Sequence, residues 1–74
     1  MPHYPVIKTK QLISVLNKKG FYFDHQKGSH ARYTDGHSKT TVPMHKEIDT
    51  LTLKSILKQT GISLDELKSI LRID

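Results

Sequence analysis

The chain has 74 residues, and its 12 Lys and Arg against seven Asp and Glu give a formal net charge of +5 at pH 7. This length suits one small domain over residues 1–74, and the absence of cysteine excludes a disulfide framework and a thiolate zinc site. No apolar run approaches the roughly 20 residues that span a bilayer, and no signal peptide is evident, so we expect a cytoplasmic protein without a membrane partner. The basic charge suits an anionic partner such as nucleic acid, although a solvated basic surface is the alternative.

The first expected element is a helix at about 9–19, which follows a lead-in at residues 1–8. Thr9 is expected to cap the start of this helix through its hydroxyl. Its apolar positions share one face of a helix, namely Leu12, Ile13, Val15 and Leu16. Gly20 is well placed to follow the C-cap.

Three segments after this helix have the two-residue period of β-strands. They are expected at residues 21–26, 29–34 and about 38–42. Lys27 and Gly28 are expected to form the first turn, and Asp35 with Gly36 is a strong hairpin signal for the second. Pro43 ends the third strand, because proline cannot donate to a ladder. The pattern therefore predicts a three-stranded meander.

Helical spacing returns in the last third of the chain. A helix at about 50–60 is stopped by Gly61, and Ser63 with Glu66 has the spacing of a capping box before a final helix. The apolar faces of these two helices are expected to consist of Leu53, Ile56, Leu57 and Thr60, then Leu64, Leu67, Ile70 and Leu71. The order α-β-β-β-α-α indicates an α+β fold, in which helices cover one face of a three-stranded antiparallel sheet and leave the other face to solvent.

The alternation of side chains across a strand assigns residues to the two sheet faces. Ala31 and Tyr33 suit the core better than their neighbours do, which turns the alternate side chains outward. The residues expected to face the helices are Ser29, Ala31, Tyr33, Thr40 and Val42. Those expected on the open face are His30, Arg32, Thr34, Lys39 and Thr41.

An imidazole among cations suits chemistry on RNA. Cations attract phosphate, and Arg can hold two phosphate oxygens at once. Histidine transfers protons near neutral pH, and RNA carries its own nucleophile, the 2′-hydroxyl. A ribonuclease therefore needs little more than an acid or base and positive charge at the phosphorus. This makes His30 the candidate catalytic residue; the alternative is that it is one surface histidine among five without a role.

Three blocks of sequence, in order, carry a family resemblance. They are Gly20-Phe21 before Lys27-Gly28-Ser29-His30 and Tyr33, then Val42-Pro43-Met44-His45, then residues 53–62. Together they resemble the HicA family of toxin–antitoxin ribonucleases, and the likeness extends over residues 9–71. A lone Gly-Ser-His would be weak evidence, whereas three ordered blocks at these spacings are specific.

The resemblance implies a fold like that of double-stranded-RNA-binding domains. It further implies a toxin of a type II system that cleaves mRNA without a metal or other cofactor and is silenced by a HicB-type antitoxin. The histidine of Gly-Ser-His, here His30, would be catalytic, with Gly28 in a tight turn and Ser29 supporting the strand start. The residues expected to contact RNA are Lys27, Gly28, Ser29, Arg32 and Lys39. Family members often have a second histidine where this chain has Ala31, which weakens any pairing of two successive histidines as acid and base.

The remaining histidines are expected to have lesser roles. His25 is expected to have a structural or edge role, with a catalytic role as the alternative. His37 is expected to be a solvated turn residue, and His3 belongs to the lead-in. His45 fixes the connection into the next helix, with contact to RNA or antitoxin as the alternative. A zinc site is not expected, because no His-x₃-His pair lies on a helix and cysteine is absent. Two other functions stay open: a non-catalytic module that binds double-stranded RNA by shape, and an adaptor whose basic face meets an acidic protein.

Overall fold

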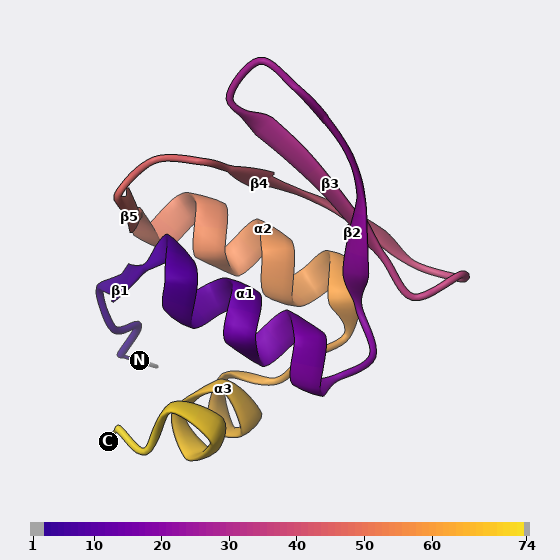
Figure 1. Cartoon of the computed structure of the whole chain (residues 1–74). Helices are drawn as coiled ribbons and strands as arrows, with labels where there is room; N and C mark the ends of the chain where they lie inside the picture. Colours follow the sequence, from indigo (N-terminus) through magenta and orange to yellow (C-terminus); the bar gives the residue numbers. More distant parts are fainter. Residues whose placement is uncertain (1–2, 74) are drawn as a thin grey trace.

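The computed structural model describes residues 3–73, so residues 1 and 2 of the expected lead-in, and residue 74, lie outside it. Within the described residues, an antiparallel sheet of β2 (Tyr22–Lys27), β3 (His30–Thr34) and β4 (Lys39–Pro43) has the order β2-β3-β4. Three helices accompany it: α1 (Thr9–Lys18), α2 (Thr50–Thr60) and α3 (Leu64–Leu71). Figure 1 shows α1 and α2 beneath the sheet, and α3 below α1. The predicted α+β class and order of elements are confirmed.

Two short strands that the sequence did not indicate join the start of the chain to the segment before α2. β1 (Ile7–Lys8) pairs antiparallel with β5 (Glu47–Ile48), and Ile7 lies opposite Ile48. Both isoleucine side chains are buried. The end of the expected lead-in is therefore part of the core. A two-residue strand is too short to show a periodic pattern, so only the tertiary pairing reveals it.

The predicted N-cap role of Thr9 is wrong. Lys8 is the N-cap of α1, and Thr9 is its first helical residue. The Thr9 hydroxyl donates instead to the carbonyl of His45, and the Thr9 N–H donates to the carbonyl of Lys46 at 3.2 Å. These bonds fasten the start of α1 to the segment after β4. At the other end, Gly20 adopts a positive φ of 91° after the C-cap, as predicted.

The caps of the last two helices follow local sequence. The Asp49 carboxylate caps α2 by accepting the Thr52 N–H at 2.7 Å, and this bond lowers the pKa of the Asp49 carboxyl. Gly61 ends α2 in the left-handed region. Ser63 and Glu66 form the predicted capping box at the start of α3, with reciprocal bonds of 3.0 and 3.2 Å.

The predicted alternation in β3 and β4 is confirmed by burial. Ala31 lies opposite Val42, and neither has measurable exposure. Tyr33 is buried on the same side, and this burial raises the pKa of its phenol. Thr40 also faces the helices and donates from its hydroxyl to Gln59 Oε1 on α2 at 2.7 Å. We call this helix-facing side of the sheet the inner face and the opposite side the outer face.

Thr34 departs from the expected pattern because the next turn covers it. It has outward parity, yet only 8% of its surface is exposed. Its hydroxyl donates to the Ser38 carbonyl at 2.8 Å and accepts the Gly36 N–H at 3.0 Å. The Thr34 side chain is therefore buried against the turn through these hydrogen bonds.

The first hairpin is shifted from its expected position by one residue. Lys27 pairs with His30, so it ends β2, and Gly28 with Ser29 forms the two-residue turn. Gly28 has a φ of 60°, a conformation that favours glycine and is common in two-residue hairpin turns. All six residues of β2 are exposed. Figure 1 shows the β2–β3 hairpin projecting past the helices, with its turn farthest from them.

Candidate functional site

The outer face carries polar side chains in three cross-strand rows. Residues directly opposite each other on antiparallel strands share a face and have Cβ atoms about 4.5–5.5 Å apart. The rows are Lys27, His30 and Pro43, then His25, Arg32 and Thr41, then Tyr22, Thr34 and Lys39. The register therefore places two imidazoles and a guanidinium in adjacent rows.

His30 is exposed at the first position of β3, and the backbone on both sides of it is held in place. The Ser29 carbonyl accepts the Met44 N–H at 2.6 Å, which continues the pairing of β3 with β4. Gln26 Nε2 donates to the Gly28 carbonyl at 2.9 Å, which braces the turn. The imidazole is therefore open to solvent on a fixed backbone.

The expected RNA contacts are not equally close to His30. Lys27 is opposite it, and Arg32 is two residues along on the same face. Arg32 is half-buried between its two row neighbours, whereas Lys39 is exposed. Lys39 pairs with the residue four positions beyond His30, which corresponds to about 13 Å along the strand. The fold thus brings Lys27, His30 and Arg32 together, and Lys39 lies at the far end of the outer face.

His25 joins this site because β2 contains an irregularity. The register passes from Phe23 opposite Tyr33 to His25 opposite Arg32, and Asp24 has no partner. Phe23 is directed to the inner face, where its ring packs edge-on against Tyr33 with centroids 5.9 Å apart. In an unbroken strand His25 would follow Phe23 to the inner face; the extra residue moves it to the outer face.

The sequence analysis therefore did not predict that His25 lies on the outer face. β2 is an edge strand of the sheet, which agrees with the expected edge position of His25, but the shift of His25 to the outer face was not foreseen. The one signal was Asp24 in an aromatic segment, since aspartate is disfavoured in regular strands. In the structure its Oδ2 lies 3.1 Å from His25 Nδ1.

The other histidines lie away from the rows. His37 is exposed in the β3–β4 turn, as expected. The backbone N–H groups of Ser38 and His37 donate to the Asp35 carboxylate, and these bonds lower the pKa of the Asp35 carboxyl. His45 fixes the connection before α2 through its backbone carbonyl, which accepts the Thr9 hydroxyl. The His45 ring is exposed, as is that of His3.

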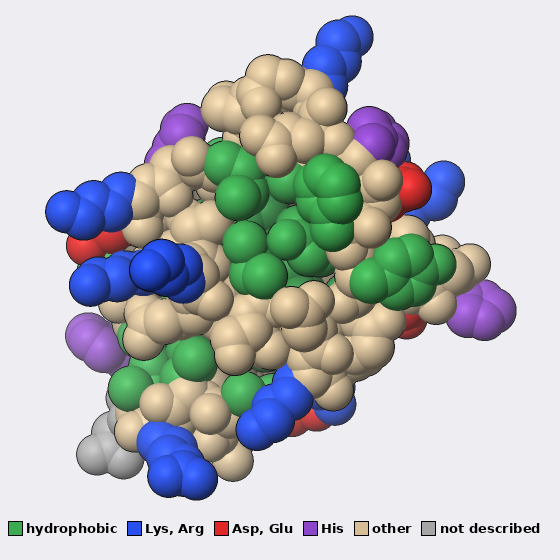
Figure 2. Space-filling view, viewed as in Figure 1, with side chains coloured by type: hydrophobic (Ala, Val, Ile, Leu, Met, Phe, Trp, Pro, Cys, Tyr) green, Lys and Arg blue, Asp and Glu red, His purple; other side chains and the backbone are tan. Residues whose placement is uncertain are grey.

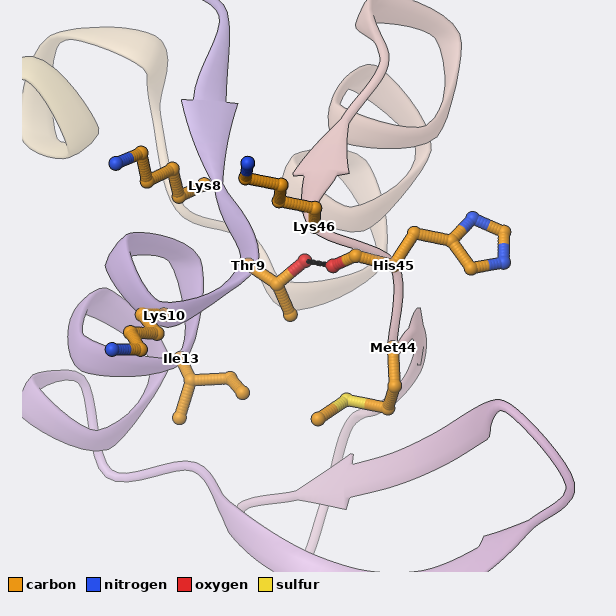
Figure 3. A pocket seen from close by; sticks show the side chains of 7 residues that line it. All are labelled: Lys8, Thr9, Lys10, Ile13, Met44, His45 and Lys46. Carbon is orange, nitrogen blue, oxygen red and sulfur yellow. Dashed lines mark hydrogen bonds between the residues drawn. The ribbon is translucent and has the colours of Figure 1, made fainter.

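A cleft opens between α1 and the segment after β4. It has a volume of about 490 Å³ and is lined by Lys8, Thr9, Lys10, Ile13, Met44, His45 and Lys46. Figure 3 shows Ile13 and Met44 on one side of it, while the lysines rim the rest and the His45 ring turns away. Figure 2, which has the viewpoint of Figure 1, shows apolar side chains gathered at the centre of this face of the molecule, with Lys and Arg around them. The cleft adjoins the end of β4, next to the row that contains His30.

The described residues also bear on metal binding and on membrane insertion. Among residues 3–73, no group of three or more His, Cys, Asp or Glu side chains is arranged to hold a metal ion. In the same part of the chain, no helix is both long enough and apolar enough to cross a bilayer. What the outer face does present is imidazoles beside cations, a set of groups that binds phosphates and transfers protons.

Comparison with known proteins gives one family match. A family model described as the HicA toxin of bacterial toxin–antitoxin matches residues 9–62. The matched stretch runs from the start of α1 to just past α2 and contains the whole three-stranded sheet. It includes the Gly28-Ser29-His30 motif, and α3 follows it. No curated protein matches the chain.

Proposed function

The chain belongs to the HicA family of bacterial toxins, and on that premise we propose that it is a metal-independent endoribonuclease that cleaves mRNA in the cytoplasm. The observation that carries the proposal is the exposed His30 imidazole with Lys27 opposite and Arg32 on the same face. A surface that only binds phosphate has no need of an imidazole. A HicB-type antitoxin is proposed as the protein that neutralises the toxin.

The proposed reaction uses the 2′-hydroxyl of RNA as the nucleophile. Its oxygen forms a bond to the adjacent phosphorus while the bond from phosphorus to the 5′-oxygen breaks. His30 takes the proton from the 2′-hydroxyl as general base, and the leaving 5′-oxygen takes up a proton as it departs, which gives a 5′-hydroxyl. Lys27 and Arg32 offset the charge that develops on the phosphoryl oxygens, and the planar Arg32 guanidinium can hold two of them.

The second candidate function is a non-catalytic module that binds double-stranded RNA. The observation that favours it is the spread of cations over about 13 Å of the outer face, from Lys27 to Lys39, because this span exceeds one phosphate. Incubation of purified protein with labelled RNA separates the two functions, since only the enzyme shortens the RNA. Growth arrest on expression, relieved by a co-expressed HicB-type antitoxin, supports the enzyme.

Cleavage by the purified protein should persist in EDTA and leave a 2′,3′-cyclic phosphate, or its hydrolysed form, together with a 5′-hydroxyl. Both expectations arise because side chains and the 2′-hydroxyl supply all the groups in the proposed reaction. Mass spectrometry of a cleaved oligonucleotide identifies the termini. A 2′-deoxy substitution at the cleaved position is the control and should block the reaction. Products with a 5′-phosphate, together with loss of activity in EDTA, would contradict the proposed chemistry.

Replacing Arg32 or Lys39 with Ala should weaken RNA binding and reduce its dependence on salt. Each lost phosphate contact lowers the slope of log affinity against log salt by roughly 0.7–0.9. The measurement is a binding titration at several salt concentrations, with Lys58→Ala as the control, because Lys58 is exposed on α2. The stability of the Lys39 variant should change by less than about 0.5 kcal/mol. An unchanged slope in the Arg32→Ala, Lys39→Ala double variant would refute this binding surface.

A further inference from the structure

The bulge in β2 gives the proposed ribonuclease a second imidazole on the same face as the first. His25 lies opposite Arg32, and His30 is two residues before Arg32 on the same side of β3. His25 and His30 are therefore diagonal neighbours, a relation that separates their positions by about 7–8 Å. Arg32 borders both of them.

This spacing suits the two ends of a phosphodiester. In-line attack places the entering 2′-oxygen and the leaving 5′-oxygen on opposite sides of the phosphorus. One imidazole can serve each oxygen only if the two rings are separated by about the width of a phosphate. Diagonal neighbours satisfy this condition with the phosphate between them, and the Arg32 guanidinium, next to both rings, can reach the remaining oxygens.

Asp24 gives His25 an orientation. The Asp24 Oδ2 atom is 3.1 Å from His25 Nδ1, and an ionised carboxylate can only accept a hydrogen bond. A hydrogen on Nδ1 satisfies this contact, and Nε2 then lies on the side of the ring away from Asp24, free for the substrate. The extra residue Asp24 thus moves His25 to the outer face and also provides the carboxylate that orients the His25 ring.

The two rings differ in that only His25 has a carboxylate beside it. His30 has Lys27 directly opposite it and Arg32 two residues along its own strand, where a neutral base can lie without charge repulsion. His25 has Arg32 directly opposite it, but the Asp24 carboxylate at its Nδ1 offsets the positive charge of a ring that carries a proton to donate. We propose that His25 is the general acid of the reaction, with His30 as the base. This inference rests on the proposed ribonuclease function.

The reaction then balances. The bond from the 2′-oxygen to phosphorus forms as the 2′-hydroxyl proton passes to His30. The bond from phosphorus to the 5′-oxygen breaks as His25 Nε2 gives its proton to that oxygen. The enzyme is left with His30 protonated and His25 neutral, and exchange with water restores both rings.

The test compares the cleavage of two RNA oligonucleotides by the full-length protein. The cleavage position in an RNA oligonucleotide is first mapped with the wild-type protein. A second oligonucleotide then carries sulfur in place of the bridging 5′-oxygen at that position. A thiolate leaves without protonation, so the sulfur substrate has no need of a general acid.

His25→Ala should cleave ordinary RNA at least about 100-fold more slowly than the wild type, because a general acid contributes 10²–10⁴-fold. It should cleave the sulfur substrate within a few-fold of the wild-type rate. His30→Ala should be slow on both substrates, since its base is needed for each. His37→Ala is the matched control and should resemble the wild type on both, because this histidine is exposed in a turn outside the rows.

A His25→Ala variant with the wild-type rate on ordinary RNA, or equally slow on both substrates, would overturn the assignment. His25→Gln provides a second variant, and folding is checked by circular dichroism; the His25 side chain is 63% exposed, so little packing is lost. If the wild type cleaves no RNA, it is the ribonuclease proposal that fails.

Discussion

His30→Ala should reduce RNA cleavage by at least about 100-fold and leave the protein folded. The loss follows from removal of a proton-transfer group, which contributes 10²–10⁴-fold in enzymes. Folding should survive because His30 is exposed next to the hairpin turn and is not part of the hydrophobic core. The measurement is the rate of degradation of labelled RNA by purified wild type and variant.

Two controls make this result specific to chemistry. Circular dichroism spectra and melting curves of the variant should match those of the wild type, since exposed substitutions change stability by less than about 0.5 kcal/mol. Co-purification with a HicB-type antitoxin should also persist. A well-folded His30→Ala protein that cuts RNA at the wild-type rate would remove His30 from the mechanism.

Leu53→Ala should produce a large loss of stability. Leu53 has no measurable exposure and belongs to the hydrophobic core. Truncation of a buried leucine costs about 2–5 kcal/mol, and a domain of this size has a total of only about 4–11 kcal/mol. The variant should therefore be partly unfolded near physiological temperature, with a corresponding loss of activity.

Leu51→Ala is the matched control, since the same substitution is made two residues earlier on the same helix. Leu51 is 77% exposed, so its truncation should cost less than about 0.5 kcal/mol. Urea denaturation measures both variants against the wild type, with equal slopes expected for the three proteins. Equal midpoints for the Leu51 and Leu53 variants would show that the described core packing is wrong.

Some features of the fold could be predicted because they arise within a few residues. Gly20 and Gly61 end helices through their own backbone freedom, and the bonds between Ser63 and Glu66 are formed over three positions. The faces of β3 follow from strict alternation, which places Ala31 in the core. The same alternation exposes His30, so the main candidate of the functional site was accessible from sequence.

Other features depend on partners far along the chain. Ile7 becomes a strand residue only because Ile48 lies opposite it, and the Thr9 hydroxyl bonds to the carbonyl of His45 in place of capping its own helix. Likewise, Lys27 ends a strand because His30 pairs with it. The conformational preferences of neighbouring residues do not include these long-range contacts. In the case of Thr9, a tertiary hydrogen bond replaces the expected capping bond within the helix.

The sequence alone determined the order of the three helices and the three strands of the main sheet, the inner face of β3 and the position of His30, because each depends on short-range periodicity or on a motif of adjacent residues. The tertiary structure alone decided which residues of β2 lie on the outer face. The alternation of side chains along one strand does not reveal an extra residue, because a bulge is defined relative to the partner strand. The bulge at Asp24 is therefore visible only in the pairing of β2 with β3. That pairing turns His25 outward beside Arg32. This is the physical reason that the position of the second histidine could be read from the tertiary structure but not from the alternation of side chains in the sequence.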